Sequence, residues 1–109
     1  MIRIEGVTRA PRNEMIARVS RAIQDAGADI LDSRFYSNLS MFVAGEIAWS
    51  KIGMLSDLLA GTGLRLNERS IEAMQEPNAG QDRLVAFHLV VVFVHDEPDL
   101  RIAVPAVPG

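Results

Sequence analysis

The sequence of 109 residues contains no cysteine and only two histidines. The absence of cysteine excludes a disulfide framework, a thiolate nucleophile and a zinc finger. Two histidines leave few candidates for general acid–base catalysis. No Walker loop, dinucleotide-binding glycine pattern or Ser-His-Asp arrangement can be recognised. We therefore expect a protein that is not an enzyme, with no catalytic residue, no cofactor and no metal site.

A surplus of positive charge and a long apolar run are also missing. The chain has 11 Lys and Arg against 14 Asp and Glu, a net charge of −3, which disfavours binding to nucleic-acid phosphates. The longest apolar run, Leu84 to Val94, is broken by His88 and is too short to cross a bilayer as a helix. Arg3 and Glu5 stand where a signal peptide would need apolar residues. We expect a cytoplasmic protein with no nucleic-acid and no membrane partner.

What the chain does contain is ordinary globular composition, with 49% hydrophobic and 23% charged residues. Its length predicts one folded unit with a single core. Residues 76–82 combine Pro, Asn and Gly without a large apolar side chain, which predicts a linker. Residues 1–75 then form the main domain. Residues 83–109 add a strand and a Pro-rich tail, either in the same folded unit or at a dimer interface.

Apolar spacing predicts the secondary structure of the main domain. The expected elements are strands over 1–7, 29–36, 41–48 and 64–74, and helices from Asn13 to Gly27 and from Ser50 to Gly61. Asn13 is expected to cap the first helix and Gly27 to end it in the left-handed conformation. Gly45 predicts a bulge or a close approach within its strand.

This βαββαβ order, in which both helices end in Ala-Gly, predicts an α+β fold. The expected architecture is a ferredoxin-like sandwich, in which a four-stranded antiparallel sheet carries two helices on one face. An additional C-terminal strand follows the linker.

Two stretches, 16–23 (Ile-Ala-Arg-Val-Ser-Arg-Ala-Ile) and 26–32 (Ala-Gly-Ala-Asp-Ile-Leu-Asp), resemble the first helix and second strand of an ACT domain. The closest type occurs in glycine-cleavage-system repressors and at the N-termini of some phosphoserine phosphatases and formyltetrahydrofolate deformylases. The resemblance covers residues 2 to 74. It departs from the family at a longer first loop, at Arg12, which replaces a glycine, and at Asp29, which replaces an asparagine. It implies binding of a small ligand, mostly an amino acid, near the first loop at a dimer interface.

The first loop offers chemistry that suits such a ligand. The turn from Arg9 to Asn13 precedes a helix N-terminus, whose free N–H groups attract a carboxylate, and Arg9 or Arg12 adds charge. Asp29 is expected near this turn, where it could hold an ammonium group, and the resemblance adds the adjacent Ile30. The predicted ligand-binding residues are Arg9, Arg12, Asn13, Asp29 and Ile30. In the simpler interpretation, Asn13 only caps the helix, the arginines are solvated and Asp29 starts a strand.

The strand over 83–94 is more apolar than a single exposed edge strand tolerates. Either it pairs within its own sheet or it crosses to a second subunit. We favour a homodimer with this strand at or across the interface; the alternative is an intramolecular fifth strand in a monomer. His88 has no metal-ligand partner at suitable spacing, so we expect it to be packed in the core or at an interface.

The best hypothesis is a small stand-alone ACT-type regulatory domain that binds an amino acid or a similar small metabolite at a dimer interface. The alternative is a ligand-free interaction or dimerisation module that uses its exposed sheet or a strand edge. A third hypothesis is a hydrolase of the acylphosphatase kind, which shares the βαββαβ order. Its phosphate loop is similar to Gly6-Val7-Thr8-Arg9, although the loop here is one residue shorter and no Asn stands at a matching position.

Overall fold

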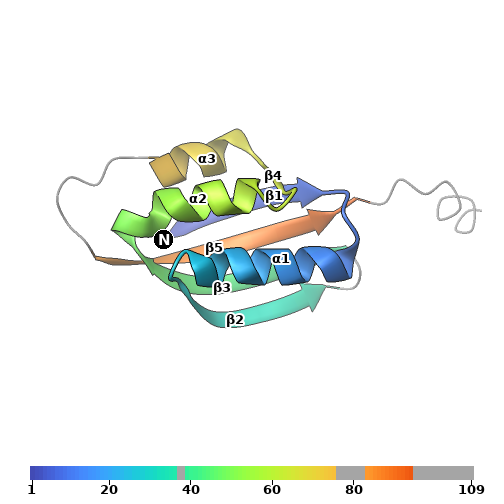
Figure 1. Ribbon diagram of the computed structural model, residues 1–109, viewed down its shortest axis with the longest axis horizontal. Coiled ribbons are helices and arrows are strands. Elements are labelled where there is room, and N and C mark those ends of the chain that lie inside the picture. The colour runs from blue at the N-terminus through green and yellow to red at the C-terminus, as the bar shows by residue number, and fades with distance from the viewer. Residues whose placement is uncertain (37–38, 76–82, 95–109) are drawn as a thin grey trace, which may run out of the picture.

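A mixed five-stranded sheet organises the chain (Figure 1). The computed structural model describes residues 1–36, 39–75 and 83–94, so the expected linker over 76–82 and the tail over 95–109 lie outside the described residues. The elements are β1 (Ile2–Thr8), α1 (Arg12–Asp25), β2 (Asp29–Tyr36), β3 (Ser40–Ala48), the short 3-10 helix η1 (Trp49–Lys51), α2 (Ile52–Ala60), β4 (Arg65–Leu66), α3 (Glu68–Gln75) and β5 (Leu84–Phe93).

The strand order β2-β3-β5-β1-β4 confirms the α+β class and is compatible with a ferredoxin-like fold. The sheet is not the expected four-stranded antiparallel one. β5 lies between β3 and β1, antiparallel to β3 but parallel to β1. A strand that is apolar on both sides is most stable in the centre of a sheet. The C-terminal strand therefore pairs within its own chain, as in the intramolecular alternative.

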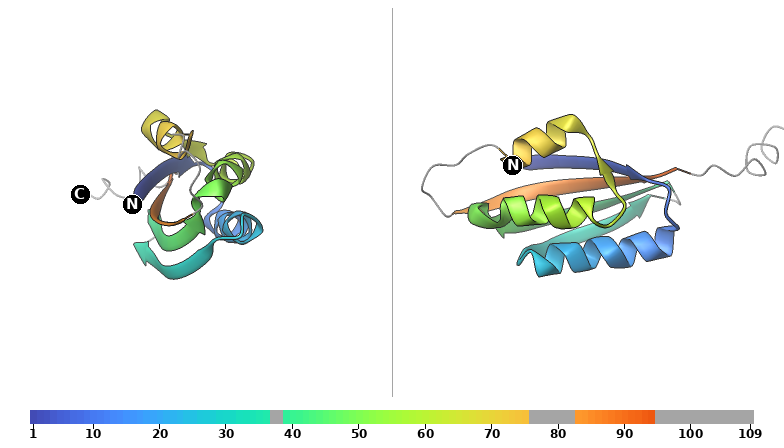
Figure 2. Two further views of the ribbon diagram at one scale, coloured as in Figure 1. Left: turned by 90° about the vertical axis from the view of Figure 1, so that its left-hand side faces the viewer. Right: turned by 45° about the horizontal axis from the view of Figure 1, so that its top comes forward.

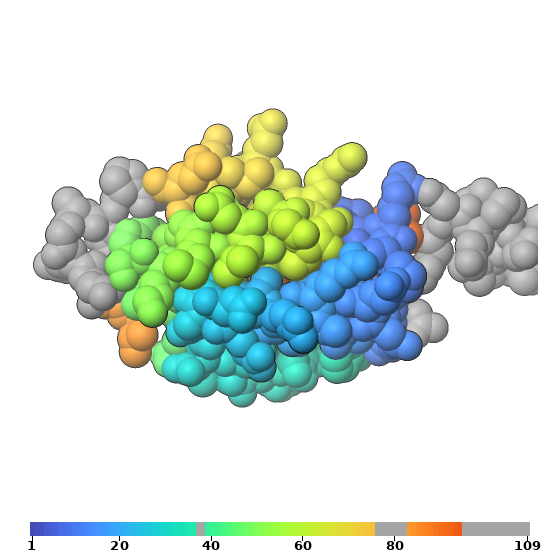
Figure 3. Space-filling view, in the orientation of Figure 1, coloured from blue at the N-terminus to red at the C-terminus, as the bar shows by residue number. Residues whose placement is uncertain are grey.

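The helices α1 and α2 cover one face of this sheet, and α3 lies beside β1 (Figure 2). In the space-filling view, α1 and α2 form a continuous layer over the strands (Figure 3). The largest fully buried side chains come from both layers: Phe87, Ile4, Met15, Ile23, Met41, Ile47, Leu55, Leu59, Met74, Leu89, Val19 and Val43. The core thus lies between the sheet and its helices.

The strand expected over 64–74 is wrong for most of its length. Only Arg65–Leu66 pairs with β1, and α3 follows directly. Asn67 accounts for the change, because its Oδ1 accepts a hydrogen bond from the backbone N–H of Ser70 at 2.8 Å and so caps the helix. Ser70 and Met74, four residues apart, are both buried, which is helical spacing.

The helix α3 also completes the edge of β1 that β4 leaves unpaired. The backbone N–H of Glu5 donates to Ser70 Oγ at 2.8 Å, and the Glu5 carbonyl accepts from Asn67 N–H at 3.0 Å. The Asn67 side-chain amide donates to Glu5 Oε1 at 3.2 Å. A two-residue strand is sufficient here because a helix N-terminus satisfies the next backbone groups of β1.

The helix ends in the structure agree only in part with those predicted from the sequence. Gly27 has a φ of +80°, the left-handed conformation expected after the first helix. The expected cap at Asn13 is wrong, because α1 begins at Arg12 after Pro11, and proline has the fixed φ that suits a helix start. The second helix begins at Ile52, after η1, rather than at Ser50.

Gly45→Ala should destabilise the protein by at least about 1–3 kcal/mol, because overpacking a filled core forces neighbours to move. A Cβ at Gly45 would lie 2.5 Å from the Asp29 carbonyl oxygen and 2.6 Å from the Phe87 ring, which is the close approach expected at this glycine. Gly53→Ala in α2 is the control, since its Cβ would meet nothing within 4 Å. Thermal unfolding of the two variants checks the prediction, and equal midpoints would contradict it.

Ser70→Ala should cost about 1–3 kcal/mol of unfolding free energy, because it leaves the Glu5 N–H without its acceptor. Ser70 is only 2% exposed, so water cannot replace the hydroxyl freely. The matched control is Ser33→Ala on β2, where the serine is exposed. Chemical denaturation measures both variants. A Ser70→Ala variant as stable as Ser33→Ala would show that the β1–α3 contact contributes nothing.

Candidate functional site

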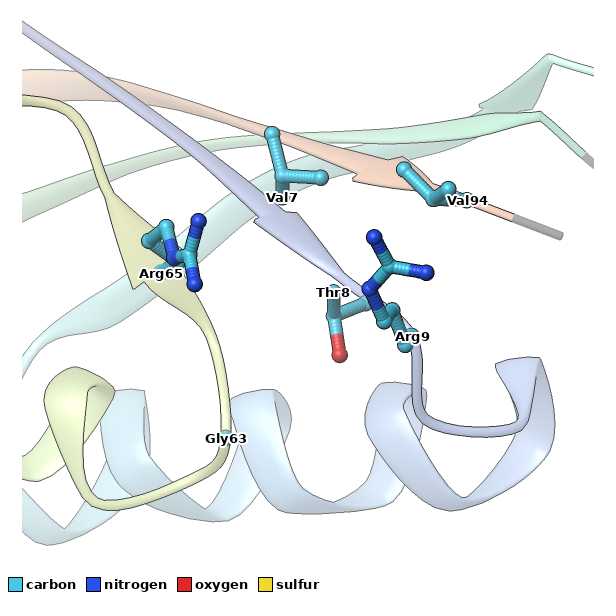
Figure 4. Close-up of a pocket in the computed structure, with 6 residues that line it drawn as sticks. All are labelled: Val7, Thr8, Arg9, Gly63, Arg65 and Val94. Atoms are coloured by element: carbon cyan, nitrogen blue, oxygen red, sulfur yellow. The ribbon is translucent and has the colours of Figure 1, made fainter. Parts of the chain in front are cut away.

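A hollow of about 280 Å³ lies at the end of the sheet where β1 finishes (Figure 4). Its lining residues are Val7, Thr8, Arg9, Gly63, Arg65 and Val94. They come from the end of β1, the turn between α2 and β4 with β4 itself, and the residue after β5. Sites for drug-sized ligands occupy about 300–1,000 Å³, so this hollow suits a small metabolite.

The turn before β4 can approach β1 because of two glycines. Gly63 has a φ of +96°, a conformation that favours glycine. A Cβ on Gly6 would lie 2.6 Å from the Leu64 side chain, so Gly6 leaves the space that Leu64 fills. The result is the pairing of Arg65 with Val7, which places the Arg65 guanidinium beside the end of β1.

Hydrogen bonds of Thr8 fix the other two sides of the hollow. Its Oγ1 accepts from the N–H of Ala10 at 3.1 Å, which shapes the turn that carries Arg9. Its carbonyl accepts from the N–H of Val94 at 2.9 Å, which holds the end of β5 against β1. Thr8 itself is only 2% exposed. A single buried threonine therefore joins two of the segments that line the hollow.

The charge of the lining favours an anion. Arg9 and Arg65 are exposed, and Figure 4 shows them on either side of Val7 and Thr8. Both charged side chains among the described lining residues are arginines. Guanidinium groups present paired N–H donors that match a carboxylate or a phosphate. The two described guanidinium groups can thus bind an anionic group.

Of the predicted site residues, only Arg9 lines this hollow. Arg12 lies at the start of α1, with its guanidinium carbon 5.1 Å from the centre of the Phe35 ring. Its Nε is buried and has no hydrogen-bond partner among the described residues. Asn13 is exposed in the first turn of α1. These two residues belong to the same end of the molecule but not to the lining.

Asp29 and Ile30 lie at the opposite end of the sheet, so the expectation that Asp29 lies near the first turn is wrong. Across the sheet, Asp29 is aligned with Ala86 near the start of β5, whereas Thr8 is aligned with Phe93 at its end. Seven residues of strand separate these levels, which corresponds to about 20 Å. The reason is that α1 runs back along the sheet before β2 begins.

Gly63, Arg65 and Val94 were not among the residues predicted from the sequence. Arg65 was an ordinary residue of an expected strand, and nothing in the apolar pattern showed that β4 would pair with the end of β1. Val94 reaches the hollow only because β5 is parallel to β1. The one available signal was Gly61-Thr62-Gly63, a turn pattern that suits a loop close to a ligand.

A second surface adjoins the hollow on the sheet face that carries no helix. Its residues alternate with the buried ones along each strand. We call it the open face and define it by Asp32 and Arg34 of β2, Phe42 and Ala44 of β3, His88 and Val90 of β5, and Arg3 and Glu5 of β1. A smaller hollow of about 210 Å³ on this side shares Val7 and Arg65 with the first. The first hollow therefore continues toward the open face.

Within the described residues, no helix is long and apolar enough to cross a membrane. The same part of the chain holds no group of three or more His, Asp or Glu residues that could bind a metal ion. No protein-family model, no curated protein and no solved structure matches this chain. The ACT resemblance therefore stays a prediction from the sequence.

Proposed function

We propose that this chain is a small cytoplasmic regulatory domain of the ACT type, which binds a small anionic metabolite at the end of β1. The observation that supports this function best is the placement of two guanidinium groups, those of Arg9 and Arg65, in the lining of one hollow. Arg9 belongs to the loop where the resemblance to ACT domains implies a ligand. Arg65 comes from a distant part of the sequence and adds the second guanidinium.

The ligand of this site carries a carboxylate or a phosphate. An amino acid fits through its carboxylate, whereas Asp29, the residue expected to hold its ammonium group, lies at the other end of the sheet. Val7 and Val94 supply the apolar part of the lining. We therefore extend the expected ligand class from amino acids to small organic anions in general.

The site is placed where binding can be transmitted. It joins β1, β4 and the end of β5, and Val7 and Arg65 also line the hollow on the open face. A ligand regulates only if it binds one state of the protein better than another. Drawing Arg65 toward a bound anion would change the charge presented at the edge of the open face, and so the affinity of that face for a partner.

A cognate anion should raise the thermal unfolding midpoint by several degrees. At about a hundred times its dissociation constant a ligand adds about 2.7 kcal/mol of stability, which is a shift of that size in a domain of this length. The panel comprises the twenty amino acids, small dicarboxylates and inorganic phosphate, each at millimolar concentration. If none of these compounds shifts the midpoint, the proposed function fails.

Arg65→Gln should abolish most of that shift, because it removes one of the two guanidinium groups while keeping a side chain of similar length. Arg69→Gln, at an exposed position of α3, is the matched control and should respond like the wild type. Asp29→Ala should also keep the full response, since it lies about 20 Å away. A response lost in Asp29→Ala but kept in Arg65→Gln would assign the ligand to another site.

The second candidate is a protein-interaction module without a ligand, which the uncovered open face favours. Val7, Tyr36 and Val92 are 41%, 53% and 40% exposed on that side. Exposed apolar side chains that lie together on one surface are typical of a protein-interaction site. The two functions are compatible if the partner of the open face responds to the ligand. The acylphosphatase alternative has less support, because the described lining residues of the hollow include no asparagine.

A further inference from the structure

The open face has an apolar centre although no element of the described chain covers it. Its middle strands present Phe42, Ala44 and Val90, and the Phe42 and His88 rings meet edge to face with centroids 5.1 Å apart. The other side of β5 is buried by the helices. A strand that is apolar on both sides is typical of a sheet covered on both faces. The helices cover one face, and among the described residues the other face is left open to a partner.

Charged side chains flank this apolar centre in an alternating pattern. The register aligns two neighbouring rows across the sheet. The first row is Arg34, Phe42, Val90 and Glu5, and the second is Asp32, Ala44, His88 and Arg3. Each row has one positive and one negative end, and the signs are reversed from one row to the next. Arg34 also bonds Asp32 at 3.0 Å along β2, and this carboxylate raises the pKa of the Arg34 guanidinium.

This alternation makes the open face complementary to itself. Two faces related by a two-fold axis must have that axis in the plane between them. With the axis along the strands, Arg34 lies opposite the partner's Glu5, and Asp32 lies opposite the partner's Arg3. With the axis across the strands, Arg34 lies opposite the partner's Asp32. In both arrangements, opposite charges meet around an apolar centre. This charge complementarity favours a second copy of the chain as the partner.

The area is sufficient for a specific contact. The four long strands have seven to ten residues each. At about 4.8 Å between strands and 3.3 Å per residue, their face is a flat patch of roughly 500 Å². Two such faces bury roughly 1,000 Å² in total, the size at which specific interfaces begin.

From these observations we infer that the open face binds the open face of a second copy, so that the protein is a face-to-face homodimer. This inference is independent of the anion site, because it uses the register and the charges of the sheet only. It differs from a strand exchanged between subunits, since β5 pairs within its own chain. The hollow shared by Val7 and Arg65 would lie at the rim of the interface.

Analytical ultracentrifugation of the full chain over a range of concentrations tests this proposal. The wild type should sediment as a dimer. Val92→Glu, on the open-face side of β5, should raise the dimer dissociation constant at least about tenfold, because it buries a charge in the interface. Met54→Glu is the matched control, since Met54 is 51% exposed on α2 and lies in the helical layer. This variant should dimerise like the wild type.

Charge reversal at exposed positions gives a second test that does not disturb the core. Arg34→Glu should weaken the dimer under either axis, because it faces an acidic residue of the partner. The double variant Arg34→Glu with Asp32→Arg exchanges the two charges and so restores an ion pair between positions 32 and 34 of β2. Recovery of the dimer in this double variant assigns the axis across the strands, and continued weakening assigns it along the strands. Circular dichroism verifies that both variants are folded.

A full chain that stays monomeric at every concentration overturns the inference. A dimer that withstands both Val92→Glu and Arg34→Glu also overturns it and assigns association to another surface, such as the free edge of β2. Neither result affects the test of the anion site, which is the ligand-induced shift of the unfolding midpoint in the wild type and in Arg65→Gln. Failure of the dimer and failure of the anion site are thus distinguishable.

Discussion

The parallel pairing of β1 with β5 is the contact on which the other features depend. It runs over the whole of β1, from Ile2 opposite Phe87 to Thr8 opposite Phe93. On its other edge, β1 pairs only with two residues of β4. The pairing places Phe87 and Leu89 in the core and brings Val94 to the end of β1. Without it, β1 would be separated from β3, and neither the hollow nor the open face would exist.

Where strand pairing stops, helix α3 continues to satisfy β1. Asn67 and Ser70 form hydrogen bonds with both backbone groups of Glu5. A helix therefore takes the position beside β1 that a longer β4 would occupy. This arrangement has a consequence for the site. Because the chain leaves the sheet after Leu66, β4 contributes little more than Arg65 at the end of β1. The short strand acts as a support for one guanidinium group rather than as a full sheet element.

The two hollows share residues, so the proposed ligand site and the proposed interface would be physically connected. Val7 and Arg65 line both the hollow of about 280 Å³ and the smaller one of about 210 Å³. The charge of Arg65 can be directed either to a bound anion or to the rim of a partner's open face. A domain of this size has room for few independent surfaces, and a shared arginine is a short path between two of them.

Local features were predictable where the local signal was strong. The bounds of β2, the left-handed Gly27 and the close approach at Gly45 were all predicted, the last two from the special backbone of glycine. The strand expected over 64–74 failed because helical spacing after Asn67 was interpreted as imperfect alternation. The hydrogen bond that marks the start of the helix runs from Ser70 N–H to Asn67 Oδ1. The residue types allow this bond, but the sequence alone does not show that it forms.

The sequence by itself determined the α+β class, the order of the first five elements, the apolar character of the last strand and the arginine at the first turn. These properties depend on neighbours within a few residues. The tertiary structure decided the place of β5 between β3 and β1, the convergence of Arg65 with Arg9 and the separation of Asp29 from both. Strand order and direction depend on contacts between residues that are distant in the chain, and such contacts leave no periodic pattern in the sequence.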